Sequence, residues 1–377
     1  MTQDLAPHDH PPYGTPTEEQ AALADAVRRA FADATARRPV PPRHDALPVA
    51  LDADLWAALA GMDLLGLGVP EASGGSGGGV QDLCVLLEEA GAAVAAVPAL
   101  GTAVVTSVLA HAPDARGVLD AVVAGTLVVT PAWETFPAAV VPQARAGALA
   151  LADGTVRGQL AAVPFGADGD LALACASRDG APVAVLLDLR ADGVTRTAVP
   201  ALDLGEPVAA VRVDGVAPEL VLDDGGLDAG LPVARLLVLA AAELVGTARR
   251  ALDDAVAHAQ VRTQFGRPIG SFQALKHLLA DRFVDLDAAR LLVRDAALLL
   301  DLGRSDRSAD AAARTALVAA MESAHAAARD GLQVHGGIGF TWEQTSHVLV
   351  RRARARRTVF GPPARVLDAL AGHVLAP

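Results

Sequence analysis

The chain has 377 residues, of which 52% are hydrophobic and 20% charged, and its net charge is −13. These proportions describe a globular protein with a large core and exclude an intrinsically disordered chain. The acidic balance argues against general nucleic-acid binding, and the two cysteines, Cys84 and Cys175, offer neither a disulfide framework nor metal-ligand spacing.

The first part of the chain predicts a tail followed by helices. Residues 1–15 are rich in Pro and His and are expected to be a disordered tail. They contain no basic region followed by an apolar one, and no apolar run in the chain has membrane length, so we expect a cytoplasmic protein without a membrane partner. Residues 16–126 form a predicted N-terminal helical domain. Its helices are expected at 18–37, 53–66, 80–94, 102–112 and 118–124, with Thr17 as the first N-cap.

Between residues 127 and 226 the segments become short, Val-rich and divided by Gly and Asp. This pattern is typical of β-strands, Asp153-Gly154 indicates a hairpin turn, and the length predicts a small β-sandwich or barrel. From 227 to 377 long helical patterns return, at 233–260, 272–302, 309–334 and 363–375, which predicts a C-terminal four-helix bundle. The predicted fold class is therefore α+β, with a β-domain between two helical domains.

One loop interrupts the helices of the last domain. The stretch RTQFGRPIGSFQALKH, Arg262 to His277, places Gly and Pro where they disfavour a continuous helix. Arg262 and Arg267, together with the free N–H groups at the start of the next helix, favour an anion. Phe265 adds an aromatic face and Gln273 an amide. These residues suit a dinucleotide, although an ordinary turn with exposed arginines would have the same sequence.

Two further motifs lie downstream. QVHGGIGFTWE, Gln333 to Glu343, has glycines that either let a ligand approach the backbone or simply end the preceding helix. RRARARRTVF, Arg351 to Phe360, has five arginines in seven residues. Because no aromatic residues interleave with this run, we expect a solvated helix face or one arm of a phosphate site, and not a nucleic-acid interface.

Together these motifs resemble those of the acyl-CoA dehydrogenase family. R-x-x-F-G-x-x-I-x-x-x-Q, about sixteen residues after the helix glycine Gly246, is similar to the family's flavin segment, and Q-x-x-G-G-x-G is similar to its second signature. The text VPEASGG and the domain order are similar as well, so the resemblance covers residues 18–375. It implies FAD as the cofactor, an acyl-CoA thioester as the substrate, α,β-desaturation as the reaction and an electron-transfer flavoprotein as the acceptor.

The resemblance also implies which residues hold the cofactor and how subunits share it. Family members dimerise through a shared flavin site and often form tetramers. The implied contacts to the pyrophosphate come from one segment, and those to the adenosine come from a neighbouring subunit. In this sequence the first set is Arg262, Gln264, Phe265, Ile269 and Gln273, and the second set is Gln333, Gly336 and Gly337.

The sequence departs from the family at the catalytic base, which removes the α-proton of the thioester. Members carry a carboxylate either twenty-four residues after the first Gly of the second motif or ten residues before the helix glycine. Here these positions hold Phe360 and Leu236, which cannot accept a proton. The nearest acids, and hence the candidate bases, are Glu243, two helical turns after Leu236, and Asp228 in the preceding loop.

The β-domain departs from the family as well. Thr130, Trp133 and Glu134 are a partial match to its first flavin-contacting segment, but Pro164 falls where the second has a hydroxyl, and Pro has no N–H. These losses resemble a subgroup that acts on bulky CoA thioesters such as steroid side chains. In that subgroup two unlike subunits form an α2β2 assembly, and only one subunit supplies the base.

Three functions therefore stay open. The chain is an FAD-dependent acyl-CoA dehydrogenase, as a homodimer, a homotetramer or one subunit of an α2β2 assembly. Alternatively, it is a non-catalytic partner that completes the FAD site of a catalytic homologue. A third alternative is a flavin monooxygenase or tailoring desaturase of the same fold. The flavin motifs favour the first two, and the missing base favours the partner.

Overall fold

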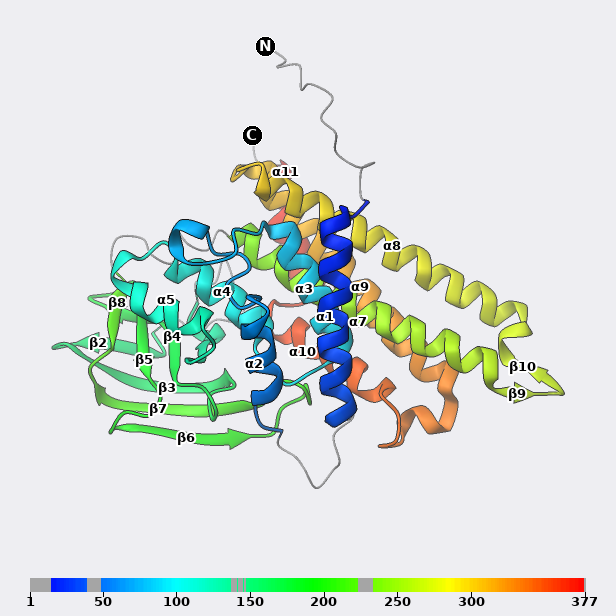
Figure 1. Ribbon diagram of the computed structural model, residues 1–377, viewed down its shortest axis with the longest axis horizontal. Coiled ribbons are helices and arrows are strands. Elements are labelled where there is room, and N and C mark those ends of the chain that lie inside the picture. The colour runs from blue at the N-terminus through cyan, green and yellow to red at the C-terminus, as the bar shows by residue number, and fades with distance from the viewer. Residues whose placement is uncertain are drawn as a thin grey trace, which may run out of the picture.

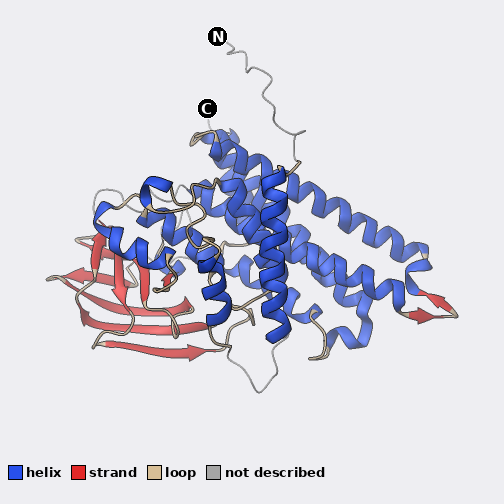
Figure 2. Ribbon diagram, viewed as in Figure 1, coloured by secondary structure: helices blue, strands red, loops and turns tan. Residues whose placement is uncertain are grey.

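The computed structural model describes residues 15–38, 49–136, 141, 145, 147–222 and 233–375. A β-sheet occupies one end of the molecule, long helices form the rest, and a small hairpin stands at the opposite end of the long axis (Figures 1 and 2). The predicted order of helices, strands and helices is confirmed. The helices before the sheet are α1 (Glu18–Arg37), α2 (Ala53–Gly61), α3 (Val80–Ala93), α4 (Ala99–Leu109) and α5 (Arg116–Val123).

Helix α1 begins and ends at the predicted residues. The Thr17 hydroxyl accepts a hydrogen bond from the Gln20 backbone N–H at 3.1 Å, and the Gln20 side chain accepts one from the Thr17 N–H at 3.2 Å. Each side chain thus satisfies a backbone donor that the first helical turn leaves free. Helix α2 is shorter than predicted: it ends at Gly61, and Asp63 follows with a φ of 58°.

The strands form one mixed sheet with the order β6-β7-β3-β2-β4-β5-β8, and β1 lies beside β4. Asp153 and Gly154 have φ values of 50° and 71° and form the predicted hairpin turn between β2 and β3. One apolar cluster joins residues of β3 and β7 to residues of β4 and β5, so the sheet bends around its own core. The strands are β1 (Val129–Pro131), β2 (Leu149–Ala152), β3 (Thr155–Pro164), β4 (Leu171–Arg178), β5 (Ala181–Asp188), β6 (Val194–Val199), β7 (Val208–Val216) and β8 (Leu220–Leu222).

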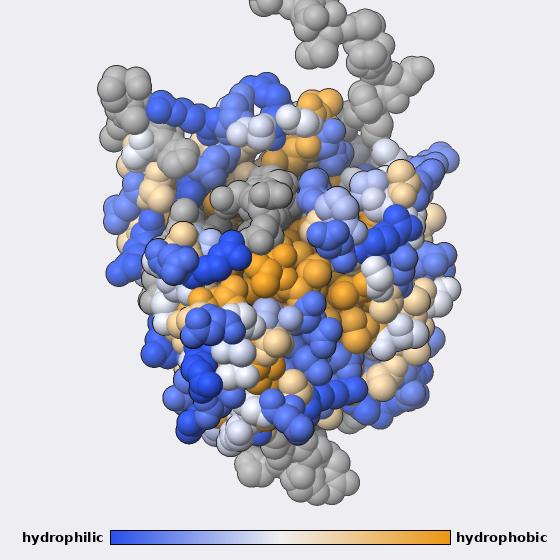
Figure 3. Space-filling model, turned by 90° about the vertical axis from the view of Figure 1, so that its left-hand side faces the viewer, coloured by the Kyte–Doolittle hydropathy of each residue, from blue (hydrophilic) through white to orange (hydrophobic). Residues whose placement is uncertain are grey.

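The β4–β5 hairpin separates two apolar cores and contributes side chains to both. Leu173 and Leu186 belong to the large core that the helices build, while Ala174 and Val185 belong to the core of the sheet. This alternation follows from the two-residue period of a strand and explains why both strands are buried almost throughout. On its outer side the sheet end shows a central apolar area among hydrophilic side chains (Figure 3).

Within residues 233–375, which the structure describes, five α-helices follow the sheet, one more than the predicted bundle of four. The additional helix, α10, contains the arginine run. The helices are α7 (Val233–Val261), α8 (Gln273–Asp301), α9 (Arg307–His335), α10 (Ser346–Val359) and α11 (Pro363–Leu375), and β9 (Thr263–Gln264) pairs with β10 (Arg267–Pro268) in the hairpin between α7 and α8.

Helices α3 and α7 cross with their backbones in contact. A Cβ at Gly246 would lie 1.9 Å from the backbone oxygen of Glu88, and a Cβ at Gly91 would lie 1.9 Å from the backbone oxygen of Glu243. The Thr247 hydroxyl donates to the Gly91 carbonyl across this crossing at 3.3 Å. The helix glycine that the sequence singles out is therefore required by packing, and the crossing sets the position of Glu243.

Helix α3 is capped from a distant part of the chain. Asp301, the last residue of α8, accepts hydrogen bonds from the backbone N–H groups of Val80 at 2.6 Å and Gln81 at 3.1 Å. Gly79 leaves room for this carboxylate, because a Cβ there would lie 2.8 Å from its oxygens. The negative charge also complements the positive end of the helix dipole.

We expect Asp301→Ala to lower the free energy of unfolding by about 1–2 kcal/mol, because two N–H groups of the first turn of α3 lose their acceptor. Urea unfolding followed by circular dichroism would measure this. Asp287→Ala, at an exposed position of the same helix, should stay within about 0.5 kcal/mol of the parent. Equal effects of the two substitutions would contradict the assigned cap.

Candidate functional site

A buried ionic cluster lies where α7, α10 and the loop before β7 meet. Arg356 is 2% exposed and contacts both oxygens of Glu243, with Nε–Oε2 at 2.5 Å and an Nη–Oε1 distance of 2.9 Å. Its two Nη atoms also donate to the carboxylate of Glu206 at 2.9 and 3.0 Å. One turn earlier, Arg352 donates to Asp203 at 2.7 Å. Both guanidinium groups are thus held by carboxylates from elsewhere in the chain.

The cluster keeps its charges because the partners offset the cost of burial. Burial alone would lower the pKa of Arg356, but Glu206 and Glu243 raise it well above its ordinary value. Burial would raise the pKa of Asp203, yet the neighbouring arginines hold that pKa below its usual range. Mutual compensation of this kind is what allows ionised groups to persist in a protein interior.

The expectation of a solvated helix face is therefore wrong for Arg352 and Arg356, although the run does form a helix. These two side chains turn inward, where acids from the loop before β7 and from α7 neutralise them. The expectation of a phosphate-binding arm is wrong for them as well, because carboxylates already occupy their donors. Arg354, on the opposite side of α10, is exposed as expected.

The same junction brings together Thr130, Trp133 and Pro164, which lie at the positions that the sequence compares with the family's flavin-contacting segments. A cavity of about 10 Å³ lies there, lined among others by Thr130, Trp133, Pro164, Glu243 and Arg356. This volume holds about one water molecule. The Thr130 hydroxyl donates to the Pro164 carbonyl at 2.5 Å, so both groups are engaged with each other.

The two customary positions of the base are apolar and closed. Leu236 is 0% exposed and Phe360 is 1% exposed. The Phe360 ring packs edge-on against Trp133, with a centroid distance of 6.1 Å, and so fills the space next to the cavity. Glu243 lies at this junction but is bound to Arg356 through both oxygens. Asp228, the other candidate base, lies outside the described residues.

The hairpin at the far end of the molecule presents the predicted flavin segment to solvent. Phe265 is 92% exposed and has a φ of 52°, and Gly266 follows with a φ of 74°, which together make the tight turn. The Arg267 guanidinium lies 4.1 Å from the centre of the Phe272 ring. Within the described residues, neither Arg262 nor Arg267 has a carboxylate at ion-pair distance. An exposed aromatic beside free guanidinium groups is suited to a phosphate and a ring.

The remaining residues of this segment divide into exposed and packed ones. Gln273 is exposed at the start of α8, and the Gln264 amide donates to the Thr263 carbonyl at 2.8 Å. Ile269 packs instead against a small apolar cluster that includes Val334 near the end of α9. The backbone of Ile269 donates to the Arg262 carbonyl at 2.8 Å and closes the base of the hairpin.

The second motif follows α9 at the same end of the molecule. Gly336 has a φ of 64°, which favours glycine, whereas Gly337 has an ordinary φ. A Cβ at Gly337 would meet no atom within 4 Å. Nothing within the described chain therefore explains a glycine at 337, and the open space fits the close approach of a cofactor or a partner. Gln333 is exposed beside it.

The two motifs, expected to act from different subunits, lie together in one chain. The rings of His258, near the end of α7, and His335, the last residue of α9, stack at a centroid distance of 4.4 Å. Figure 1 shows this end of the bundle opposite the sheet. The two motifs that are expected to bind the dinucleotide therefore lie at one end of the molecule, and the closed junction lies toward the other end.

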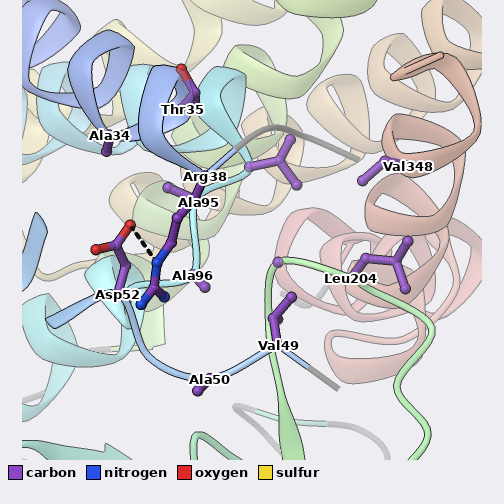
Figure 4. Close-up of a pocket in the computed structure, with 12 residues that line it drawn as sticks. Ala34, Thr35, Arg38, Val49, Ala50, Asp52, Ala95, Ala96, Leu204 and Val348 are labelled. Carbon is purple, nitrogen blue, oxygen red and sulfur yellow. Dashed lines mark ion pairs between the residues drawn. The ribbon is translucent and has the colours of Figure 1, made fainter. Parts of the chain in front are cut away.

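A second cavity, of about 60 Å³, lies between α1, α3, the loop before β7 and α10. Its lining is mainly apolar, and the Arg38 Nε and Asp52 Oδ2 atoms at its edge are 3.9 Å apart (Figure 4). This volume is well below the ~300 Å³ at which ordinary small-molecule sites begin. Elsewhere in the described chain, no group of three or more His, Cys, Asp or Glu side chains could hold a metal ion, and no helix could span a bilayer.

Comparisons with known proteins give a consistent result. The chain matches the acyl-CoA dehydrogenase N-terminal domain over residues 17–116 and the C-terminal domain over residues 228–375. It is 32% identical to acyl-CoA dehydrogenase IpdE2 of Mycobacterium tuberculosis, over 86% of this chain and 87% of that protein. It is 35% identical to acyl-CoA dehydrogenase FadE34 of the same organism over 84% of this chain, but spans only 42% of that protein.

Solved structures agree. A variant of the Tcur3481-Tcur3483 steroid ACAD superposes with a TM-score of 0.82 at 29% identity, over 95% of this chain and 98% of that one. The ChsE4-ChsE5 complex from Mycobacterium tuberculosis gives 0.81 at 25% identity, over 97% and 99%. The chain therefore belongs to the acyl-CoA dehydrogenase family, whose members are flavoprotein oxidoreductases that act on CH–CH bonds.

Proposed function

We propose that this chain is one subunit of an FAD-dependent acyl-CoA dehydrogenase made of two homologous but unlike chains. In this assembly it contributes cofactor-binding surface, and the partner contributes the base. The observation that carries the proposal is the closed junction: a cavity of about 10 Å³ stands where an acyl thioester and a base would have to meet.

The state of Glu243 supports this division of roles. A general base needs a free lone pair within hydrogen-bond reach of the proton that it removes. Arg356 donates to both oxygens of Glu243 and so fixes this carboxylate in the ionic cluster, and with the side chain only 5% exposed a substrate proton has little access to it. We therefore assign Glu243 to the ionic cluster, where it stabilises the chain, and not to proton transfer.

The open end of the molecule supports a shared cofactor. The residues that would hold FAD here are Arg262, Phe265 and Gln273 in the hairpin segment and Gln333 and Gly337 after α9. When bound, FAD would supply the hydride acceptor of the reaction. The hairpin and the sheet lie at opposite ends of the long axis (Figure 1), and we propose that a flavin held against the β-domain of one subunit meets the hairpin of another.

The substrate and partner follow from the relatives and are part of the proposal. One similar structure is described as a steroid ACAD and the other as a complex of two named proteins. We propose a bulky acyl-CoA substrate for the assembly, a homologous partner chain in an α2β2 arrangement and an electron-transfer flavoprotein as the acceptor.

The test is to purify the chain alone and after co-expression with a homologue that carries a carboxylate at a customary base position. We expect stoichiometric flavin absorbance and acyl-CoA-dependent bleaching only for the co-purified complex. If the isolated chain binds one FAD and oxidises an acyl-CoA by itself, the proposal is wrong.

A substitution at Gly337 separates cofactor binding from folding. We expect Gly337→Ala to leave the melting temperature of the isolated chain unchanged, since the added methyl group meets nothing within 4 Å. In the complex it should weaken FAD binding about tenfold, which corresponds to about 1.4 kcal/mol of steric cost. Flavin release measured by fluorescence would show this. Gly117→Ala, at an equally open helix position, is the control, and identical flavin affinity in both variants would contradict the assignment.

A further inference from the structure

The stacked His258–His335 pair connects the two segments that the proposed function assigns to FAD. The Arg262 N–H donates to the His258 carbonyl at 2.9 Å, so the hairpin begins one helical turn after this histidine. His335 immediately precedes Gly336. The ring contact therefore bridges the start of the hairpin and the start of the glycine segment.

The pair is held more firmly on one side than on the other. His335 is buried, with Nδ1 at 2.8 Å from the Gly331 carbonyl and 3.3 Å from the Ser346 hydroxyl. His258 is half-buried, and its ring forms no hydrogen bond with another described residue. Its orientation therefore depends on the stacking contact with His335. Apolar side chains from α7, α8 and α9 pack around the same helix ends.

We propose that the His258–His335 stack is a positioning element, which holds the hairpin and the glycine segment as one rigid surface and releases them on acidification. Neither ring is required to touch the cofactor or the substrate. The inference rests on the proposed function for its biological meaning, but the coupling itself is a property of the isolated chain.

The charges around His258 determine the direction of the pH effect. Burial, His335 and the Arg262 guanidinium all lower the pKa of His258. On the same helix, Asp254 is paired with Arg250 at 2.9 Å, and Leu275, Leu278 and Leu279 of α8 pack against the apolar cluster at these helix ends. The Ser346 hydroxyl of α10 contacts His335. A histidine whose pKa is lower in the ordered form than in the opened form takes up its proton on opening. The ordered form is therefore fully stable above about pH 6.5 and loses stability as the pH falls below that value.

The experiment is hydrogen exchange on the isolated chain from pH 7.5 to 5.5, corrected for intrinsic rates. The Arg262 and Ile269 amides report on the hairpin. The Gly336 amide donates to the Gln333 carbonyl and reports on the glycine segment. The Val245 amide in the middle of α7 reports on global unfolding. We expect the protection of the first three to fall as the pH drops below about 6.5, by no more than about tenfold per pH unit, the limit for one linked proton, while that of Val245 stays level.

Two substitutions separate positioning from bulk stability. His258→Phe keeps an aromatic ring on His335 but cannot be protonated at position 258, so protection should be high and should fall less with pH than in the parent. His258→Ala removes the stack, so protection should be low at every pH. His111→Phe, an exposed histidine near the end of α4, is the control and should behave as the parent does.

The hydrogen-exchange results test the positioning role of the stack without a measurement of enzyme activity. A parent curve as flat as that of His258→Phe, or full protection in His258→Ala, would overturn the coupling and leave the proposed function untouched. Conversely, a co-expressed complex without flavin would refute the proposed function even if the exchange data follow the expected pattern. In a flavin-containing complex, His258→Ala should bind FAD more weakly than His258→Phe at pH 7.5.

Discussion

Replacing Gly246 by alanine is expected to abolish folding. The new Cβ would lie 1.9 Å from the backbone oxygen of Glu88, where ordinary contacts begin at 3.4 Å. The obstacle is backbone, which cannot rotate away as a side chain can, so α3 and α7 would have to separate along much of their length. Both helices contribute to the largest apolar core. Separating them should cost more than about 5 kcal/mol, which is comparable to the whole stability of many domains.

The measurement is soluble yield together with the thermal unfolding of whatever is recovered. Gly91→Ala should have the same effect, because its Cβ would lie 1.9 Å from the Glu243 carbonyl in the same crossing. Gly117→Ala in α5 is the matched control, where nothing lies within 4 Å and alanine should be neutral or stabilising by up to about 1 kcal/mol. A soluble Gly246→Ala protein with the melting temperature of the parent would rule out the backbone contact.

Replacing Arg356 by methionine is expected to lower the free energy of unfolding by about 3–5 kcal/mol. Methionine has a similar length and no charge, so it leaves the buried Glu243 carboxyl without its partner, which is the costly way to break a buried pair. Glu206 loses its two hydrogen bonds at the same time. Urea unfolding monitored by circular dichroism would measure the loss.

Two further variants test the physical reason. Arg354→Met, on the exposed side of the same helix, should change stability by less than about 0.5 kcal/mol. The double variant Arg356→Met/Glu243→Leu removes both buried charges and should recover a large part of the loss, since a well-packed apolar pair often equals a buried ionic one. If the double variant were less stable than Arg356→Met alone, the cost would lie in packing and not in the unpaired carboxylate.

The features that the sequence predicts well are those whose causes are local. Thr17 and Gln20 satisfy each other's backbone groups within one helical turn, so the start of α1 can be read from four residues. The Asp153-Gly154 turn depends on two neighbouring backbone conformations. In both cases the residues that determine the structure are adjacent in the chain, and no distant partner is needed.

The features that the sequence does not predict depend on partners far along the chain. Arg356 can be buried because Glu206 and Glu243 neutralise its charge. These partners lie 150 and 113 residues away in the sequence, and the run of arginines itself gives no indication of them. Asp301 caps a helix that begins 221 residues earlier. The open space around Gly337 and the stacking of His258 on His335 likewise appear only once α7 and α9 are placed side by side.

The crossing of α3 and α7 also has a consequence for biosynthesis. Gly91 and Thr247, which touch in the finished protein, are 156 residues apart in the chain. At synthesis rates of about 5–20 residues per second, α3 leaves the ribosome on the order of ten seconds before its partner helix exists. During that interval α1 can pack against α3, but the α3 face around Gly91 has no partner helix. The face that lets the two helices meet so closely is therefore the part of α3 that stays uncovered until α7 emerges.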